Sequence, residues 1–471
     1  MRLGALTGSD ETPVVTGFAI DHRKVAPGTV FGAFAGAKFN GEDFIAAAVQ
    51  AGAIAVVARP EAVVEGVVHI ADENPRERFA QLAAQFFRPF PATAVAVTGT
   101  NGKTSTVEMT RQLWRMAGHH AASIGTLGVT TAGEQVSTGL TTPDIVTFLS
   151  NVAGLAREGV THLAFEASSH GLSQYRTEGL PVQAAAFTNL SRDHLDYHGD
   201  MCAYFHAKLR LFADVLDAGG TSVVWADDAN SERVIDLARA RGNRLITVGE
   251  HGDTLRLAMR EPTLLGQKLT IVAGGTAYVV TMPLIGAYQA ANALTAAGLV
   301  IATGGEVGPT LANLARLQPV RGRLERAAIK GNGAPIYVDY AHTPDALEAA
   351  GAALRPHATG RLIMVLGAGG DRDPGKREPM GNAAAYWADV RIVTDDNPRG
   401  EDPAAIRAAI IKGCLDAIEI GDRRAAIKAA IDMAEAGDIV LIAGKGHEQG
   451  QMVGDLVLPF DDVSVARECA A

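Results

Sequence analysis

Cysteine, basic charge and long apolar runs are all scarce in this 471-residue chain. Its three cysteines, Cys202, Cys414 and Cys469, lie far apart. An odd number at such spacing gives neither a disulfide framework nor a metal-binding pattern, and it fits a reducing compartment. No apolar run approaches the roughly 18 residues of a membrane span, and the first residues resemble no signal peptide. These absences predict a cytoplasmic protein with no membrane partner.

The charge balance is acidic. Lysine and arginine number 42 against 52 aspartate and glutamate residues, for a net charge of -10. A nonspecific nucleic-acid binder would show a basic face, so no nucleic-acid partner is expected. A small anionic ligand stays compatible, because a few cations and backbone N–H groups can hold one. At about 150 residues per domain, the length predicts about three domains.

Composition along the chain suggests where these domains begin and end. The segment 44–58 reads as a helix, a break at Gly52 and then a buried strand. Two prolines in the segment 88–91 indicate a linker. A strand over 92–97 and a helix from about Lys103 to near Gly118 open the next part. The predicted domains are residues 1–88, 89–319 and 320–471.

The last part repeats one pattern four times: a short apolar strand followed by a polar cluster. Continuous apolar strands alternating with helical stretches predict an α/β fold with a parallel sheet covered on both faces. Ligands bind such sheets at the carboxyl ends of the strands. We therefore expect the four polar clusters to form a site there. The strands are predicted at 336–338, 362–366, 390–394 and 439–443.

A glycine-rich turn lies between the predicted strand at 92–97 and the helix that follows it. Its glycines let backbone N–H groups approach phosphate oxygens, Lys103 can offset phosphate charge, and Thr104 offers a hydroxyl to Mg²⁺. Val97 occupies the first glycine position of the usual phosphate-loop spacing, so this is not an ordinary P-loop. The alternative is a plain turn with an incidental lysine. The candidate phosphate-binding residues are Gly99, Thr100, Asn101, Gly102, Lys103, Thr104 and Ser105.

The segment 98–104, Thr-Gly-Thr-Asn-Gly-Lys-Thr, resembles the ATP-binding loop of the Mur ligases and of the related folylpolyglutamate synthetases. Further matching segments follow in order over nearly the whole chain. The resemblance implies three domains. They are a smaller N-terminal α/β domain that binds a UDP-linked precursor, a central P-loop-type ATPase with a mostly parallel sheet, and a C-terminal Rossmann-like domain that binds an amino acid.

The resemblance also implies metal ligands. Glu166 follows an apolar strand and would hold Mg²⁺ together with Thr104, while His194 would meet a second Mg²⁺. Lys208 matches the family lysine that CO₂ carboxylates, which turns a cation into an anionic ligand. Lys103, His194 and Lys208 are thus the implied catalytic residues. From the residues alone, Glu166 reads as a surface carboxylate, His194 as a loop histidine and Lys208 as a solvated helix lysine.

Three further residues match ATP contacts of the family. Asn292 would contact adenine, although Gln289 replaces the Asn that usually precedes it in that helix. Arg323 would reach phosphate, and Asp339 the ribose hydroxyls. The alternatives are a water-facing helix residue for Asn292, an exposed hinge charge for Arg323, and a cap for the helix that starts near Pro344 in the case of Asp339.

Other segments resemble the precursor contacts of the diamino-acid-adding members of the family. His22 stands where those members usually have Ser, which affects the contact with the UDP group. The segment 141–144 alone reads as a helix N-terminus, and the remaining residues as loop polar groups or a solvated cation. The implied precursor contacts are His22, Thr141, Thr142, Ser168, Gln174 and Arg176.

The segment Asp396-Asn397-Pro398-Arg399 accompanies meso-diaminopimelate in that branch of the family. Diaminopimelate differs from lysine by a distal carboxylate, which a guanidinium can bind through two parallel hydrogen bonds. The alternative is an Asn-Pro turn with a surface arginine. The implied amino-acid contacts are Arg372, Asp396, Asn397, Pro398, Arg399, Gly444 and Glu448.

The resemblance therefore predicts an ATP- and Mg²⁺-dependent ligase, with carboxylated Lys208, that acts as a monomer. It would add meso-diaminopimelate to the D-glutamate γ-carboxylate of a UDP-N-acetylmuramoyl-dipeptide through an acyl phosphate, in peptidoglycan synthesis. Two alternatives stay open: the same reaction with L-lysine, and a noncatalytic UDP-sugar-binding homologue.

Overall fold

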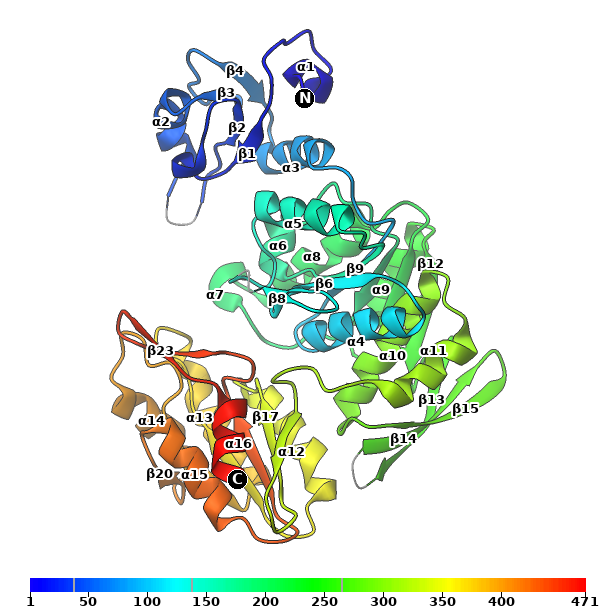
Figure 1. The fold of residues 1–471 in the computed structure, drawn as a ribbon, viewed down its shortest axis with the longest axis vertical. Helices are drawn as coiled ribbons and strands as arrows, with labels where there is room; N and C mark the ends of the chain where they lie inside the picture. Colours follow the sequence, from blue (N-terminus) through cyan, green and yellow to red (C-terminus); the bar gives the residue numbers. More distant parts are fainter. Residues whose placement is uncertain (37–38, 137–138, 264–265) are drawn as a thin grey trace. The chain divides into compact units, whose positions relative to one another are not determined.

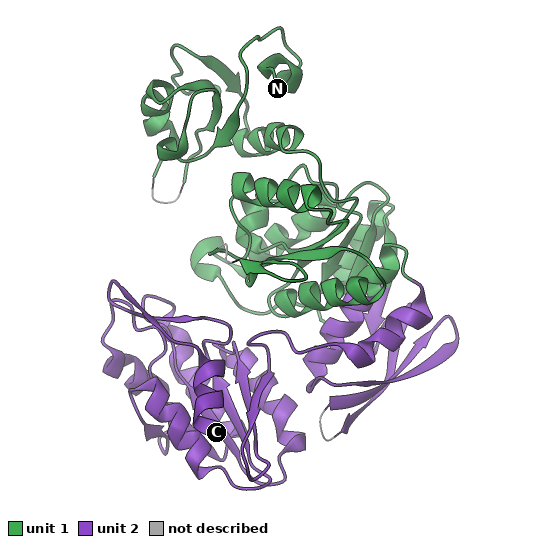
Figure 2. Ribbon diagram, in the orientation of Figure 1, with its two compact units in different colours: residues 1–246, 298–305 green, residues 247–297, 306–471 purple. Residues whose placement is uncertain are grey.

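A computed structural model describes residues 1–471 except 37–38, 137–138 and 264–265. The chain divides into two compact units, drawn in different colours in Figure 2: residues 1–246 with 298–305, and residues 247–297 with 306–471. The division falls inside β12 (Arg244–Gly249) and α10 (Ala287–Ala302). The three-part division after residues 88 and 319 is finer than this one and stays a prediction.

The first unit begins with a small parallel sheet in the order β1-β2-β3-β4 (Figure 1). The predicted helix, break and strand at 44–58 are confirmed, because Gly52 separates α2 from β3 with a φ of 106°. A Cβ at Gly52 would press on Pro27, so the turn needs glycine. The elements are α1 (Leu3–Thr7), β1 (Gly17–Ala19), η1 (His22–Lys24), β2 (Thr29–Gly32), η2 (Gly41–Phe44), α2 (Ile45–Gln50), β3 (Ala53–Ala58), β4 (Val68–Ala71) and α3 (Pro75–Phe86).

A larger, mostly parallel sheet follows, and seven of its eleven strands lie next to one another in this unit in the order β11-β10-β5-β9-β6-β7-β8. The strands from β11 to β6 run parallel, and β7 and β8 add an antiparallel edge. The strands are β5 (Thr93–Thr98), β6 (Ala121–Gly125), β7 (Gly128–Thr130), β8 (Gln135–Val136), β9 (His162–Glu166), β10 (Ala184–Phe187) and β11 (Thr221–Trp225). The helices are α4 (Lys103–Met116), α5 (Ile145–Arg157), α6 (Ser169–Ser173), α7 (Leu195–His198), α8 (Met201–Arg210), η3 (Leu211–Val215) and α9 (Ser231–Ala240).

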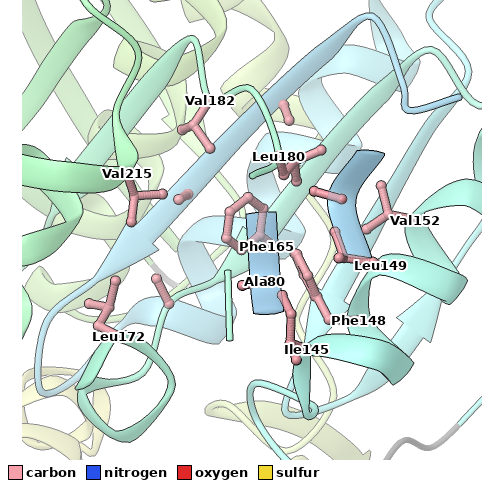
Figure 3. Packing of buried hydrophobic residues seen from close by; sticks show 14 of the residues in the cluster. Ala80, Ile145, Phe148, Leu149, Val152, Phe165, Leu172, Leu180, Val182 and Val215 are labelled. Carbon is pink, nitrogen blue, oxygen red and sulfur yellow. The ribbon is translucent and has the colours of Figure 1, made fainter. Parts of the chain in front are cut away.

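Helix α5 packs on this sheet through aromatic and aliphatic side chains. Phe148 of α5 meets Phe165 of β9 edge to face, with 5.1 Å between ring centroids, and both are fully buried. Figure 3 shows them in one cluster with Ile145, Leu149 and Ala80. This packing fixes the strand that ends at Glu166.

The second unit contains three antiparallel strands and a six-stranded sheet in the order β16-β17-β21-β18-β19-β20. Only the β16–β17 pair of the larger sheet is antiparallel. The strands are β13 (Leu255–Thr263), β14 (Gly266–Ala273), β15 (Thr276–Met282), β16 (Glu325–Ile329), β17 (Pro335–Asp339), β18 (Leu362–Leu366), β19 (Val390–Val393), β20 (Ile418–Glu419), β21 (Ile439–Ala443), β22 (Gly450–Val453) and β23 (Leu456–Pro459). The helices are α11 (Val307–Asn313), η4 (Leu314–Arg316), α12 (Pro344–Leu354), η5 (Arg355–His357), η6 (Pro374–Lys376), α13 (Arg377–Trp387), α14 (Pro403–Ile411), α15 (Arg423–Met433) and α16 (Asp462–Ala470).

Helices cover both faces of this sheet, as the continuous apolar strands predicted. In β18, Leu362 and Met364 belong to a core cluster with α12, α13 and α14, while Ile363 and Val365 belong to one with α15 and α16. Successive side chains of a strand point to opposite faces, so a strand buried on both faces is apolar throughout. The α/β fold class and the four parallel strands are thereby confirmed.

Within the described ranges, no helix combines the length and the apolar character needed to cross a membrane.

Replacing Phe148 with alanine should lower the free energy of unfolding by about 3–5 kcal/mol, the usual cost of deleting a buried aromatic side chain. Calorimetry should show a lower transition temperature for the first unit. The control is Tyr386→Ala, since the Tyr386 side chain is 80% exposed and its loss should leave the transition unchanged. Equal transition temperatures for wild type and Phe148→Ala would contradict the packing described here.

Candidate active site

The turn between β5 and α4 needs glycine at two positions. Gly99 has a φ of 147° and Gly102 a φ of 85°. A Cβ at Gly99 would collide with the Thr188 hydroxyl, so the loop approaches the neighbouring segment closely. Helix α4 starts at Lys103, which places the loop at a helix N-terminus, where backbone N–H groups favour an anion. The predicted strand, turn and helix are confirmed.

The segment that follows β10 holds this loop in shape. The Asn101 backbone N–H donates to Asn189 Oδ1 at 2.9 Å, and the Thr188 hydroxyl donates to the Asn101 carbonyl oxygen at 2.6 Å. The Ser191 backbone N–H donates to Thr100 Oγ1 at 2.9 Å. Sequence reasoning assigned no role to Thr188, Asn189 or Ser191, although the segment 188–191 directly after a strand was a usable signal.

Two lysine side chains converge on the Gly99 carbonyl oxygen. Lys103 Nζ donates to it at 3.0 Å and Lys208 Nζ at 2.6 Å. Lys208 is 1% exposed, and its Nζ lies 4.3 Å from the ring centroid of Tyr204. Burial first, and then the charge of Lys103, lower the pKa of Lys208 well below its usual value. The interpretation of Lys208 as a solvated lysine is therefore wrong.

Glu166 ends β9 and is 2% exposed, so its interpretation as a surface carboxylate is also wrong. Its Oε1 accepts from the Thr126 backbone N–H at 2.7 Å, and its Oε2 from the Thr126 hydroxyl at 3.2 Å. A Cβ at Gly125 would collide with the carboxylate. Backbone and hydroxyl donors thus fix a buried carboxylate next to the phosphate-loop strand, with which β9 pairs.

His194 lies at the start of α7 in a left-handed conformation with a φ of 54°. Its ring centroid is 4.8 Å from that of His170 and 6.2 Å from that of Tyr204, the ring that covers Lys208. Burial, followed by the charge of His194, lowers the pKa of His170 to about 4. The structure therefore brings His194 close to Lys208 and adds a neutral imidazole, His170, that sequence reasoning missed.

The hydroxyl and carboxylate oxygens of this site are ligands that suit Mg²⁺. No group of three or more His, Cys, Asp or Glu side chains that could hold a metal exists among the described residues. Mg²⁺ does not need such a cage, because it usually binds one or two carboxylates together with substrate phosphates and water. A hydroxyl at Thr104 and a carboxylate at Glu166 fit that pattern.

Most of the predicted precursor contacts join one network that ends at Glu166. The Thr142 hydroxyl donates to the Glu166 carbonyl oxygen at 2.8 Å, and the Ser168 backbone N–H donates to Thr142 Oγ1 at 3.1 Å. Arg176 donates to the Thr142 carbonyl oxygen at 2.8 Å and to Gln174 Oε1 at 2.7 Å. The interpretation of Arg176 as a merely solvated cation does not fit these contacts.

The alternative interpretations of the segment 141–144 and of Ser168 are partly correct. Asp144 caps the N-terminus of α5 by accepting from the backbone N–H groups of Val146 and Thr147, as the segment 141–144 suggested. Ser168 likewise caps α6. Thr141 still joins the network, because its hydroxyl lies 3.1 Å from that of Thr126, which holds Glu166.

His22 stands apart from this network. It begins η1 and stacks on Phe44, with 4.5 Å between ring centroids and an angle of 3° between the rings. A flat ring at this position could support a uridine or only pack on Phe44. Its predicted role in precursor binding stays a prediction.

The second unit contains the three predicted nucleotide contacts, Asn292, Arg323 and Asp339. Asn292 is 5% exposed, so it does not face water. Arg323 lies over the Tyr340 ring, 4.6 Å from its centroid. Asp339 accepts from the Leu324 backbone N–H, and burial, opposed by Arg323, raises its pKa to about 6. Thr343, not Asp339, caps α12.

The carboxyl ends of β19 and β21 bring together most of the predicted amino-acid contacts. Asn397 Nδ2 donates to Glu448 Oε2 at 2.7 Å, and a Cβ at Gly444 would collide with the Asp396 carboxylate. Arg399 donates to the Gly370 carbonyl oxygen at 2.9 Å. By contrast, Arg372 is exposed and makes no hydrogen bond to this group in the part of the chain that the structure describes.

A buried lysine within this group was missed by sequence reasoning. Lys445 is 0% exposed, and its Nζ donates to Asn397 Oδ1 at 3.0 Å and to Glu448 Oε2 at 3.2 Å. The signal was present as a Gly-Lys-Gly turn directly after a strand.

Comparisons with known proteins show the family of this chain. Three family models match in order: "Mur ligase family, catalytic domain" over residues 14–87, "Mur ligase middle domain" over 97–300, and "Mur ligase, glutamate ligase domain" over 322–446. A protein of Zymomonas mobilis is 60% identical over 458 residues, which are 96% of this chain and 94% of that one. The chain belongs to the Mur ligase family. The relative is named UDP-N-acetylmuramoyl-L-alanyl-D-glutamate--2,6-diaminopimelate ligase, as is a Bradyrhizobium diazoefficiens protein that is 52% identical to this Mur ligase over 98% of this chain and 97% of the other.

Solved structures show the same three-domain α/β fold. A UDP-N-acetylmuramoyl-L-alanyl-D-glutamate--2,6-diaminopimelate ligase structure matches this Mur ligase with a TM-score of 0.74 and 32% identity, over 100% of this chain and 98% of the other. The MurF ligase of Thermotoga maritima, solved in complex with ADP, matches with a TM-score of 0.64 and 21% identity over 96% of each chain. At that identity the second likeness concerns the fold alone.

His447 should make the protein less stable in acid. It is partly buried, and burial, followed by the charges of Arg323 and Arg321, lowers its pKa to about 3. The unfolded state therefore binds more protons between pH 6.5 and pH 3, and stability falls as pH drops below 6.5. From pH 6.5 to pH 5 the loss should be about 2 kcal/mol, at about 1.4 kcal/mol per pKa unit.

Thermal unfolding of wild type and His447→Gln at pH 7 and pH 5 measures this loss. The variant should lose less stability in acid than wild type. His206→Gln, which changes an exposed histidine, should behave as wild type. An unchanged acid response in His447→Gln would contradict the prediction.

Proposed function

We propose that this Mur ligase is an ATP-dependent amide ligase. It adds meso-2,6-diaminopimelate to the D-glutamate γ-carboxylate of UDP-N-acetylmuramoyl-L-alanyl-D-glutamate, in peptidoglycan precursor synthesis in the cytoplasm. The observation that supports it most is the likeness, at 60% and 52% identity over almost the full length, to ligases that carry this name. We expect a monomer, with residues 1–88, 89–319 and 320–471 as precursor-binding, ATP-binding and amino-acid-binding domains.

The reaction needs activation because a carboxylate and an ammonium do not condense favourably in water. ATP supplies a phosphoryl group that converts the γ-carboxylate to an acyl phosphate, which the amine then attacks with loss of phosphate. The residues 99–105 hold the phosphates through backbone N–H groups, and Lys103 offsets charge on the transferring group. Lys103 donates to the Gly99 and Thr100 carbonyl oxygens of the loop, and this position of its ammonium at the proposed phosphate loop supports the role.

Mg²⁺ would supply charge neutralisation and orientation of the phosphates. Thr104 and Glu166 would hold one ion, and His194 with carboxylated Lys208 the other. Glu166 is suited to this role because the Thr126 donors fix its orientation without neutralising its charge. In the second unit, Asn292, Arg323 and Asp339 would contribute adenine, phosphate and ribose contacts.

Carboxylation of Lys208 is chemically favoured by its surroundings. A neutral amine attacks CO₂, forms a C–N bond and loses a proton, which leaves a carbamate anion. The lowered pKa of Lys208 provides the neutral amine that this step requires. The resulting anion would also face Lys103 with opposite charge, in place of the like-charge pair at the Gly99 carbonyl.

Selection of diaminopimelate over lysine would rest on Arg399. Its guanidinium is anchored at one nitrogen by the Gly370 carbonyl oxygen, which leaves other N–H groups for the distal carboxylate. Glu448 would bind the adjoining ammonium and the Asn397 amide N–H a carboxylate beside it, and Asp396, Pro398 and Gly444 shape the turn around them. Arg372 is exposed and would have to become ordered on binding.

Phosphate release tests the proposed function directly. The purified protein should release phosphate only when ATP, the UDP-linked dipeptide and diaminopimelate are all present, and mass spectrometry should show the tripeptide product. Comparable kcat/KM for L-lysine would favour the lysine-adding alternative. Correctly folded protein that forms no product with either amino acid would favour the noncatalytic homologue.

Arg399→Ala should lower kcat/KM for diaminopimelate by about 10- to 100-fold, since a carboxylate loses its charged partner. The small activity with lysine should change little, because lysine has no distal carboxylate. Arg424→Ala is the control, because the exposed side chain of Arg424 pairs with the exposed Glu468. An equal loss with both amino acids would rule out a role in selection.

Lys208→Met should reduce activity by roughly 100-fold or more, because an anionic ligand and its charge are lost. Wild-type activity should also fall when CO₂ is removed and recover when bicarbonate is added, and ¹³C NMR with labelled bicarbonate should show a carbamate signal that the variant lacks. Lys268→Met, which changes a half-exposed side chain paired with Glu261, is the control. Activity that is independent of bicarbonate, without a carbamate signal, would exclude carboxylation.

A further inference from the structure

The turn after β21 forces one lysine into the interior. Gly444 and Gly446 on either side of Lys445 have φ values of 119° and 55°. A Cβ at Gly444 would collide with the Asp396 carboxylate, and one at Gly446 would press on Tyr340. Both flanking positions therefore need glycine, and the backbone they allow leaves Lys445 with none of its surface exposed.

The buried ammonium contacts three candidate substrate-binding side chains. Lys445 Nζ donates to Asn397 Oδ1 at 3.0 Å and to Glu448 Oε2 at 3.2 Å, and it lies 4.0 Å from Asp396 Oδ1. A fully buried lysine is costly unless its charge is paired and its donors are used. Here both conditions are met by residues that would recognise the amino acid.

These contacts fix which way the Asn397 amide points. Its Oδ1 accepts from Lys445 Nζ and from the Met452 backbone N–H at 2.9 Å, while its Nδ2 donates to Glu448 Oε2 at 2.7 Å. A reversed amide would place Nδ2 against two donors and its oxygen against a carboxylate. Lys445 and the Met452 backbone N–H therefore set the amide orientation from one side, and Glu448 sets it from the other.

The same contacts leave one carboxylate oxygen of Glu448 available. Oε2 accepts from both Asn397 and Lys445, whereas Oε1 has a long contact of 3.5 Å with the Tyr340 hydroxyl. The side chain is about one third exposed, at 31%. Oε1 is thus the oxygen that can accept from a substrate ammonium.

The other buried cation nearby is already engaged. Arg423 is bound through two nitrogens by Asp462, at 2.8 and 2.6 Å, and it donates to the Ala443 carbonyl oxygen at 3.0 Å. Among the described residues, Lys445 is the cation within ion-pair distance of both Asp396 and Glu448. Removal of its charge would leave two carboxylates close together without a paired cation.

We propose that Lys445 is a positioning residue of the amino-acid subsite. Its ammonium orients the Asn397 amide and the Glu448 carboxylate so that Asn397 Nδ2 can donate to a carboxylate of the diamino acid and Glu448 Oε1 can accept from its ammonium. Lys445 acts through these residues and does not touch the substrate. The inference rests on the proposed function, since it assumes that Asn397 and Glu448 bind the amino acid.

Steady-state kinetics of Lys445→Met tests the inference. Methionine keeps the length and apolar part of the side chain and removes the charge. KM for diaminopimelate should rise about tenfold or more, the equivalent of one lost charge-assisted hydrogen bond. KM for ATP and for the UDP-linked dipeptide should stay within about twofold of wild type, because those ligands use other residues.

Lys330→Met is the matched control. Lys330 is a partly buried lysine in the same unit as Lys445, and its Nζ donates to the carbonyl oxygens of Ile431, Asp432 and Ala434. Its loss should lower the transition temperature and leave KM for diaminopimelate unchanged. If Lys445→Met behaves in the same way, Lys445 is merely structural and the inference is wrong.

A double-mutant cycle keeps the test decisive if Lys445→Met folds poorly. Lys445→Met/Glu448→Gln removes both opposing charges, and its rise in KM for diaminopimelate should be smaller than the product of the two single effects, because Lys445 acts in part through Glu448. Independent effects that multiply in the double variant would overturn the inference. Wild-type protein that makes no product at all would instead refute the proposed function, so the two failures are distinguishable.

Discussion

Parallel pairing of strands is the constraint on which both candidate sites depend. All strands of a parallel sheet end at the same edge, so the residues that follow neighbouring strands must lie near one another. In the first unit, β5, β9 and β10 deliver the phosphate loop, Glu166 and the segment 188–191 to one edge. In the second unit, β17, β18, β19 and β21 do the same for Asp339 and the candidate amino-acid contacts.

Each site is organised around a buried lysine, and the neighbours decide what that lysine can do. Lys208 shares the Gly99 carbonyl oxygen with Lys103, so burial and like charge both disfavour its ammonium. Lys445 instead faces the side chains of Asn397 and Glu448, which accept hydrogen bonds from its ammonium. A like-charge neighbour favours a reactive amine, whereas acceptor neighbours favour a fixed cation that orients other groups.

Sequence patterns could predict what depends on the local chain. The apolar strands, the glycines of the loop 99–102 and the polar residues after each strand were all predicted and are all present. Depth of burial could not be predicted in the same way. Lys208 and Asn292 lie on helices whose spacing allows an exposed or a buried side chain, and only packing against other segments decides between them. The support of the phosphate loop by Asn189 and Ser191 was missed for the same reason, because it joins segments about 90 residues apart.

The two arginines assigned to amino-acid selection are not equivalent in this fold. Arg399 is fixed by two hydrogen bonds and by its backbone conformation. Its backbone N–H donates to the Met452 carbonyl oxygen, and its guanidinium donates to the Gly370 carbonyl oxygen. Its φ of 50° fixes the direction of the chain. Arg372 is exposed, so binding must first order a side chain that carries about 2 kcal/mol of conformational entropy. Preorganised groups convert more of their contact energy into affinity than mobile ones do. Discrimination against lysine should therefore depend on Arg399 first, and any contribution of Arg372 is reduced by the cost of its ordering.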